Sequence, residues 1–317
     1  MSPGPVLVFS GQGSQWPGMA RELLDDPPFA EAVAVVEPVF RAELGLSPAA
    51  ALAEGDLGGA DRIQALLYAV HLGLAGMLRA RGVRPGAVIG HSVGEIAAAV
   101  VAGALSARDG ARLSCRRSLL LRRAVGGGAM ALVTLPFAEA AARLRGRPDL
   151  VAAIDSAPAS CVVSGTPAAV AALAGQWPDA GVYPVASDVA FHSPQMDALL
   201  PDLVAAVADL VPSPCRTPVY STTLPDPRAA LVADGTYWAA NLRRPVRLTR
   251  AVTAAVEDGH RDFVEVAPHP VVAESIRRTL AALGVAPGVV AAVQRRHRPQ
   301  LPTFLSAITP WRTEQCA

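Results

Sequence analysis

The sequence predicts an α/β fold built on a parallel sheet with a small subdomain inserted into it, and three observations support this class. Short β-branched runs alternate with longer alanine- and leucine-rich runs, which is typical of parallel strands joined by crossover helices. A serine stands between two glycines where one apolar run gives way to a helical one. Between about residues 127 and 190 the order becomes strand, helix, strand, strand, helix, strand, which predicts a ferredoxin-like unit.

The first part of the chain predicts two buried strands and three helices. The strands are 5–9 (PVLVF) and 87–90 (AVIG), and the helices are 62–82, the run after Ser92 to about Ala102, and 107–125. Gly103 directly follows the second of these helices and is typical of a helix end.

The chain is expected to divide into three segments. Residues 1–126 predict the first part of a large subdomain, 127–190 the ferredoxin-like small subdomain, and 191–317 the second part of the large subdomain with a C-terminal tail. Residues 263–267 (FVEVA) predict a late buried strand, and the tail from about residue 295 predicts a surface segment. Clefts between such parts are common binding sites, so we expect the site there.

Composition disfavours several function classes. The 317 residues are 51% hydrophobic with a formal net charge of +1, and this balance does not indicate nucleic-acid binding. The N-terminus lacks the features of a signal peptide, and no apolar stretch is expected to reach the roughly 20 residues of a membrane span. We therefore expect a cytoplasmic protein that binds neither nucleic acid nor membrane. The absence of lysine indicates GC-rich coding, as in actinobacteria and other bacteria.

Cysteine and histidine spacing does not indicate a metal site. The four cysteines are Cys115, Cys161, Cys215 and Cys316. They lie far apart without a CxxC pair, so we expect reduced thiols. His260, His269 and His297 also lack metal-ligand spacing, and no metal is expected.

Ser92, in the stretch AVIGHSVGEIAAAVVAG, is the first candidate for chemistry. A strand that ends in Gly-x-Ser-x-Gly and turns straight into a helix is the nucleophile-elbow arrangement of an α/β-hydrolase-like core. Gly90 and Gly94 let neighbouring chain pass, and the first helix amides, beginning with Val93, point to where an ester or thioester oxygen gains negative charge. The alternative is a chance turn in which Ser92 is an N-cap.

Two further stretches favour the chemical interpretation. The glycine-rich loop 9–19 (FSGQGSQWPGM) follows the first strand and matches neither a phosphate loop nor a dinucleotide-binding turn. The segment 189–197 (VAFHSPQMD) places His192 in a loop just after the small subdomain. Since serine alone is unreactive, this histidine is the candidate base.

With GQGSQW, GHSVGE, RRS and VAFHSP in this order, the chain resembles the malonyl-CoA:acyl-carrier-protein transacylase family, especially the acyltransferase domains of type I polyketide synthases. The resemblance covers nearly the whole chain. It implies that Ser92 is the nucleophile and His192 the general base and acid, with the histidine held by an amide residue at the position of Asn241. It also assigns Gln12, together with the Val93 amide, to the oxyanion hole.

Arg117, in CRRS, matches the family arginine that pairs with the free carboxylate of malonyl groups. A guanidinium offers a planar, two-pronged donor to a carboxylate, and a neutral acyl group such as acetyl cannot use it. The alternative is that this arginine and its neighbours form the solvated face of a helix. That set is Arg116, Arg117, Arg122 and Arg123.

The resemblance also indicates which residues select the acyl group. Phe191 is expected to fill the space that an α-methyl branch needs, which favours malonyl, and Val93 favours it too. Val189 departs from both the malonyl and the methylmalonyl patterns of the family. Gln64 is expected to contact substrate, although Ala65 follows it where many relatives have proline. These stretches are most similar to acyltransferase domains of iterative synthases that form small aromatic acids.

We therefore expect an acyltransferase of polyketide or antibiotic biosynthesis, acting as a discrete enzyme. It would move malonyl from malonyl-CoA, through an acyl-serine, to the phosphopantetheine thiol of an acyl carrier protein, with no bound cofactor. Exposed arginines would guide an acidic carrier to the enzyme. Examples are Arg243, Arg244, Arg277, Arg278 and those in 295–298. The alternatives are a shuttle of finished aromatic or aminoacyl groups between carriers, an editing hydrolase, and a non-catalytic carrier-binding module.

Overall fold

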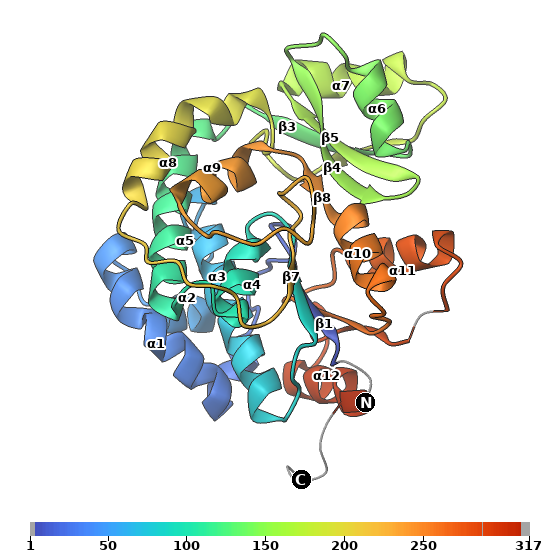
Figure 1. The fold of residues 1–317 in the computed structure, drawn as a ribbon. Coiled ribbons are helices and arrows are strands. Elements are labelled where there is room, and N and C mark those ends of the chain that lie inside the picture. The colour runs from blue at the N-terminus through green and yellow to red at the C-terminus, as the bar shows by residue number, and fades with distance from the viewer. Residues whose placement is uncertain (1–3, 287, 312–317) are drawn as a thin grey trace.

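Five short strands run side by side in the larger part of the molecule, in the order β10-β9-β1-β2-β7 (Figure 1). The computed structural model describes residues 4–286 and 288–311. The strands are β1 (Val6–Phe9), β2 (Ala87–Gly90), β7 (Val219–Tyr220), β9 (Phe263–Val266) and β10 (Val290–Ala292). Every neighbouring pair is parallel, so the carboxyl ends of these strands meet at one edge of the sheet.

Side chains of β1 point alternately into two cores, one on each face of this sheet. Leu7 and Phe9 belong to the larger core, whereas Val6 and Val8 belong to the smaller one. Helices of the larger core are α1 (Pro27–Leu44), α2 (Pro48–Glu54), α3 (Ala60–Ala80), α4 (Gly94–Ala102) and α5 (Ala107–Leu121). Those of the smaller core are α10 (Leu248–Glu257) and α11 (Ala273–Ala282). The predicted α/β class is confirmed.

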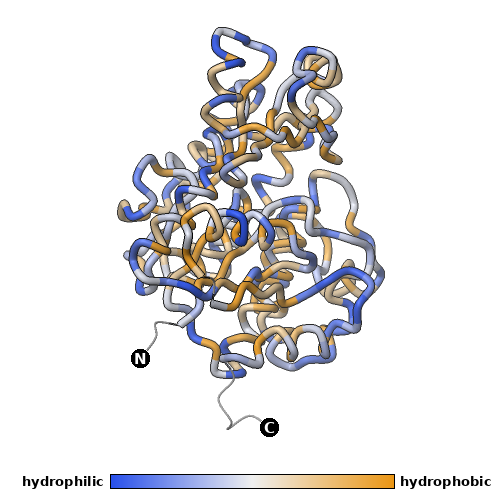
Figure 2. Tube along the Cα trace, turned by 90° about the vertical axis from the view of Figure 1, so that its right-hand side faces the viewer, coloured by the Kyte–Doolittle hydropathy of each residue, from blue (hydrophilic) through white to orange (hydrophobic). Residues whose placement is uncertain are grey.

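Several shorter helical segments also belong to the larger part of the molecule. They are α8 (Leu200–Ala206), α9 (Gly235–Arg243), η1 (Arg21–Asp25), η2 (Arg122–Ala124), η3 (Pro194–Leu199) and η4 (Thr309–Trp311). Figure 2 shows the chain by hydropathy: apolar stretches run through the body, and hydrophilic stretches are frequent in its outer loops.

The helix α3 is long and apolar enough, by length and composition, to cross a membrane. This differs from the expectation that no stretch reaches that length. Most of its residues are buried in the folded chain, where it packs against α1 and α5. A helix enclosed on most sides in a core needs an apolar surface nearly all round, which explains its composition.

The second sheet has the order β6-β3-β5-β4-β8. Its elements are β3 (Ala129–Val133), α6 (Phe137–Arg143), β4 (Leu150–Ala157), β5 (Ser160–Gly165), α7 (Pro167–Gln176) and β6 (Val182–Val185). The pairs β3–β5, β3–β6 and β4–β5 are antiparallel, which is the ferredoxin-like arrangement. Ala131 and Val133 pack in the small core, while Met130 and Leu132, on the opposite face of β3, line a cavity against the larger part.

The fifth strand of this sheet, β8 (Val246–Arg247), comes from the later part of the chain. It pairs in parallel with β4, where Val246 faces Ile154 and Arg247 faces Asp155. Figure 1 shows β8 below the small subdomain, at its junction with the larger part. The strands β3 to β6 lie within 127–190 and β8 lies outside that range, and the division of the chain into 1–126, 127–190 and 191–317 stays a prediction.

The C-terminal tail differs from the expected surface segment. A helix, α12 (Gln300–Ala307), follows residues 295–298, and Phe304 and Ile308 are fully buried in the larger core. The apolar residues at 301, 304, 305 and 308 have helical spacing, which the high Arg and Pro content obscured. Cys115, Cys161 and Cys215 are free thiols, and Cys316 lies outside the described residues.

Candidate active site

Ser92 lies at a sharp turn between β2 and α4, on the carboxyl edge of the parallel sheet. Its φ is +56°, in the left-handed region that residues other than glycine rarely adopt. A Cβ at Gly90 would lie 2.2 Å from Glu95 Cα, and a Cβ at Gly94 would lie 2.0 Å from the Phe9 carbonyl oxygen. Only glycine fits both positions, so these residues allow the tight turn of a nucleophile elbow.

His192 is hydrogen-bonded to Ser92. The distance from Ser92 Oγ to His192 Nε2 is 2.8 Å, and His192 Nδ1 lies 2.9 Å from the Arg244 carbonyl oxygen. A carbonyl can only accept a hydrogen bond, so Nδ1 carries the proton and the lone pair of Nε2 faces the serine hydroxyl. His192 also has a positive φ, +57°. The tautomer with its proton on Nδ1 is the one that a general base for serine needs.

Burial keeps the imidazole of His192 neutral. The side chain is 2% exposed, and burial lowers its pKa to about 3, with the positive charge of Arg117 acting in the same direction. The ring of His192 is therefore unprotonated near neutral pH, and its Nε2 can accept the proton of Ser92 during the reaction.

Asn241, the residue expected to hold this histidine, contacts it through its backbone and not through its side chain. The Asn241 side chain donates from Nδ2 to the Ser92 carbonyl oxygen at 3.1 Å and to Glu95 at 2.8 Å, and its Oδ1 accepts from Arg117 Nη1 at 2.5 Å. The backbone groups that hold the histidine belong to Asn241 and Arg244, at the C-terminal end of α9. Asn241 thus joins the serine turn to the arginine.

Arg117 is fully buried, so the solvated-helix alternative does not apply to it. Its Nε donates to Gln64 Oε1 at 3.1 Å, Nη1 donates to Asn241, and Nη2 has no partner within residues 4–286 and 288–311. Burial lowers its pKa to about 10, which still leaves it protonated near neutral pH. By contrast, Arg116 pairs with Glu43 and Asp209 on the outside of α5. Nη2 is thus a buried charged donor that lacks a partner among the described residues, although Arg117 is not among the residues that line the cavity at Ser92.

A buried carboxylate, Glu95, completes the polar centre and was not assigned this role by the sequence analysis. It accepts hydrogen bonds from the Thr222 amide at 2.5 Å, Tyr237 Oη at 2.6 Å and Asn241 Nδ2 at 2.8 Å. Further donors are the hydroxyls of Ser221, Thr222 and Thr223. The run of three hydroxyl residues after β7 was the signal in the sequence, but its contact with Glu95 spans more than 120 positions.

Two backbone amides lie free beside the serine. Neither the Val93 N–H nor the Gln12 N–H is hydrogen-bonded to any part of the chain that the structure describes. The Gln12 side chain accepts from Gln64 Nε2 at 3.2 Å, and both glutamines line the cavity that contains Ser92. Donors without protein partners at this place suit a developing oxyanion.

The cavity at Ser92 has a volume of about 260 Å³ and lies between the two sheets. Its polar wall includes Gln12, Gln64, His91 and His192, and its apolar wall includes Met130, Leu132, Ile154, Val162 and Phe191. Phe191 therefore lies where the acyl-selection hypothesis needs it. Val189 does not line the cavity: it is 1% exposed and packs in the larger core, because the loop before His192 is pressed against Gly128.

Comparison with known proteins agrees with this geometry. Residues 6–316 match the family described as the acyl transferase domain. The chain belongs to this family. It is 47% identical over 306 residues to 6-methylsalicylic acid synthase of Aspergillus terreus, and 48% identical over 299 residues to a mycocerosic acid synthase-like polyketide synthase of Mycolicibacterium smegmatis. These alignments cover 96% and 92% of the chain, but only 17% and 14% of the relatives.

A solved acyltransferase domain has the same fold. The structure of the acyltransferase domain of the polyketide synthase PpsC of Mycobacterium tuberculosis matches with a TM-score of 0.84 and 40% identity, covering 89% of this chain and 88% of that one. The predicted resemblance to polyketide synthase acyltransferases is confirmed, including the similarity to a synthase of a small aromatic acid. The chain is an acyltransferase of a family in which a serine nucleophile is characteristic. The relatives named above are large synthases, of which the matched region is one part.

Proposed function

We propose that this acyltransferase moves malonyl from malonyl-CoA to the phosphopantetheine thiol of an acyl carrier protein in polyketide biosynthesis. The observation that carries the proposal is the buried Arg117, whose Nη2 lacks a partner among the described residues, in the same polar network as the Ser92–His192 pair. A malonyl group has both a thioester for the serine and a carboxylate for the guanidinium.

In the first half-reaction, Ser92 Oγ attacks the thioester carbonyl while its proton passes to His192 Nε2. The oxyanion accepts hydrogen bonds from the Val93 amide and from Gln12, and Asn241 keeps the Ser92 turn aligned with Arg117. When the intermediate collapses, the carbon–sulfur bond breaks and the CoA sulfur takes the proton from Nε2. Malonyl remains as an ester on Ser92.

In the second half-reaction, the carrier thiol gives its proton to His192 Nε2 and attacks this ester. The carbon–oxygen bond to Ser92 breaks, the serine oxygen regains the proton, and malonyl leaves on the carrier. CoA and phosphopantetheine are substrates in this scheme, which needs no bound cofactor. We further propose that the enzyme acts in the cytoplasm, either as a discrete enzyme or as one part of a longer synthase.

Intact-protein mass spectrometry tests the proposal. Malonyl-CoA, methylmalonyl-CoA and acetyl-CoA are each mixed with the enzyme and with Ser92→Ala, with and without a holo carrier protein. We expect a malonyl adduct that Ser92→Ala lacks and that moves to the carrier. An adduct obtained only from an acylated carrier would support a carrier-to-carrier shuttle instead, and release to water faster than transfer would indicate a hydrolase.

A further inference from the structure

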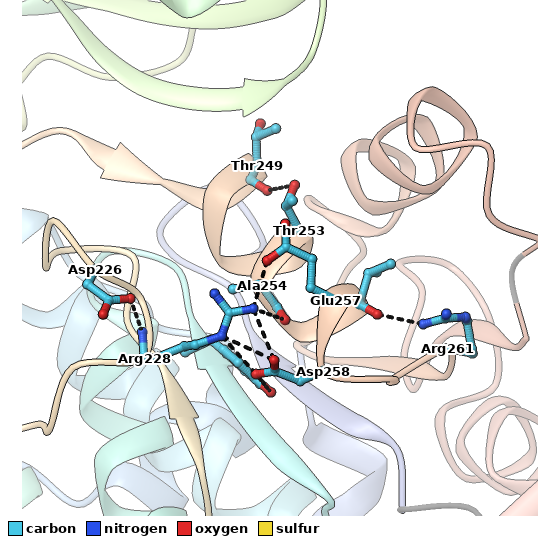
Figure 3. Close-up of polar contacts among 10 residues, drawn as sticks. Asp226, Arg228, Thr249, Thr253, Ala254, Glu257, Asp258 and Arg261 are labelled. Atoms are coloured by element: carbon cyan, nitrogen blue, oxygen red, sulfur yellow. Dashed lines mark hydrogen bonds and ion pairs between the residues drawn. The ribbon is translucent and has the colours of Figure 1, made fainter.

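The arginines expected to guide a carrier fall into two groups in the structure. Arg243 pairs with Asp197 at 2.5 Å, and Arg277 and Arg278 pair with Glu274 at 3.5 and 3.2 Å. The charge of Arg243 is thus balanced by one carboxylate, whereas Arg277 and Arg278 share the single carboxylate of Glu274. Arg228 was not among the expected arginines, and it is paired with both Asp258 and Glu257 at the end of α10 (Figure 3).

The residues Arg295, Arg296, His297 and Arg298, which we call the basic loop, are different. All are exposed, and within the described ranges none of the three arginines forms an ion pair. Their charge acts on the surroundings: burial, and then Arg296 and Arg295, lower the pKa of nearby His269. The loop is thus an uncompensated positive surface.

The fold fixes this loop at both ends. Gln294 Nε2 donates to the Gln300 carbonyl oxygen at 2.8 Å, which closes the neck of the loop. The Gln300 side chain donates from Nε2 to the Gly18 carbonyl oxygen at 2.9 Å, and the Gln300 backbone N–H donates to the Glu22 carboxylate at 2.8 Å. Both glutamines are 3% exposed. A loop that is already ordered loses little conformational entropy when it binds a partner.

The basic loop lies on the same edge of the parallel sheet as Ser92. It follows β10, three strands away from β2, so the lateral separation is about 14 Å at the usual strand spacing. Arg296 N donates to His269 Nδ1 at 3.2 Å, and the His297 ring lies 6.0 Å from the Trp16 ring. His269 and Trp16 belong to the two loops that bring Val272 and Gln12 to the cavity.

We propose that the basic loop is the docking contact for an acidic face of the acyl carrier protein, which is held there while its phosphopantetheine arm reaches Ser92. This rests on the proposed function, because the carrier is the acceptor of the second half-reaction. Exposed charges spread along a loop suit a broad acidic protein surface. Arg244 is also exposed, but its carbonyl holds His192, so it is left unchanged in the test.

The test compares two variants with three measurements. The loop variant is Arg295→Ala with Arg296→Ala and Arg298→Ala, and the matched control is Arg277→Ala with Arg278→Ala, which removes arginines that are already paired. The measurements are malonyl loading from malonyl-CoA, transfer from the malonyl-enzyme to free pantetheine, and transfer to the holo carrier protein that the wild-type enzyme uses fastest. Binding of a fluorescently labelled holo carrier protein, chosen as the one that the wild-type enzyme binds most tightly, is followed by anisotropy at increasing salt.

In the loop variant we expect loading and transfer to pantetheine to be unchanged, while KM and Kd for the carrier rise about tenfold and depend less on salt. The control should stay within about twofold. Carrier transfer and binding at wild-type levels would overturn the proposal. Weaker loading from malonyl-CoA would also overturn it, by assigning the loop to the CoA phosphates. If the proposed function fails, the wild-type enzyme itself takes no malonyl, and the anisotropy comparison still decides whether the loop binds a carrier.

Discussion

At Arg117 a positive charge is held where water cannot solvate it, and its direct partners are neutral side-chain amides, those of Gln64 and Asn241. The nearest carboxylate in this network, Glu95, is reached through Asn241. A buried charge without an adjacent counter-ion costs free energy, and a substrate carboxylate at Nη2 would offset part of this cost. Selectivity for an acidic acyl group would follow from this arrangement.

Replacing this arginine should therefore change which acyl group is loaded. We expect Arg117→Met to lower the kcat/KM of malonyl loading by about 10²-fold, because a charge-assisted contact is lost, and to leave acetyl loading unchanged or faster. Arg116→Met, on the solvent side of the same helix, is the control and should load malonyl normally. Equal losses for malonyl and acetyl would show that Arg117 supports only the structure of the site.

The low pKa of His192 predicts the acid side of the pH profile. The neutral ring is the active base, so loading is lost only as pH falls through the folded-state pKa, which burial lowers to about 3. We expect the loading rate, measured by rapid quench, to stay within about twofold between about pH 8 and pH 5.5. A histidine of ordinary pKa would lose about tenfold over this range. Circular dichroism at each pH checks that the enzyme is folded, and a midpoint near 6.5 would contradict the assignment.

At the scale of elements, the turn between β2 and α4 depends on an absent side chain. A Cβ at Gly94 would lie 2.0 Å from the Phe9 carbonyl oxygen, so Gly94→Ala must displace β1 or the helix start. We expect it to lower the free energy of unfolding by about 2 kcal/mol or more and to abolish loading. In Gly175→Ala, within α7, the new Cβ meets nothing within 4 Å, so urea titration should show stability gained by up to about 1 kcal/mol. Equal effects would refute the elbow account.

The local order of apolar and turn residues was enough to predict many of the strands and helices. β1, β2 and the units of the small subdomain were visible as apolar runs between turn residues, and Gly103 marked the end of α4 with a φ of +87°. The helix α1 was not predicted, since Pro38 interrupts its sequence pattern. The two-residue strands β7 and β8 exist only through pairing with distant strands.

Some residues of the candidate site could likewise be predicted from local motifs, and others could not. Ser92, His192 and Arg117 were named from motifs, and the structure brings them into one polar network. The partners of Asn241 and the role of Glu95 could not be read from sequence, because each depends on contacts between residues more than 120 positions apart. Val189 was expected to contact substrate, but the direction of a loop side chain is set by packing around it.

At the scale of the whole molecule, buried histidines make stability depend on pH. Burial lowers the pKa of four of them, by the most in His71, His91 and His192 and by less in His260. Burial lowers the pKa of His71 to about 3, of His91 to about 4 and of His192 to about 3. Below about pH 6.5 the unfolded chain binds protons that the folded chain does not, so stability falls as pH falls. The loss at pH 5.5 is about 1.4 kcal/mol for each of His71, His91 and His192, or about 4 kcal/mol for the three together, partly offset by the raised pKa of Glu265.

Urea unfolding between about pH 8 and pH 5.5 measures this dependence. His71→Phe removes a buried histidine that does not line the cavity at Ser92, and it should reduce the pH-dependent loss by about 1.4 kcal/mol. A free energy of unfolding that stays constant over this range would show that these rings titrate alike in the folded and unfolded chains, and the lowered pKa of His192 would be contradicted.

In the proposed reaction Ser92 carries the malonyl group between the two half-reactions. Peptide-level tandem mass spectrometry of enzyme quenched in acid shortly after mixing with malonyl-CoA tests it most directly, with Ser92→Ala and His192→Ala in parallel. We expect a malonyl ester on Ser92 in the wild-type enzyme, none in Ser92→Ala, and slow formation in His192→Ala. Malonyl on any other residue, or an unmodified Ser92 when malonyl has been transferred to the carrier, would contradict it.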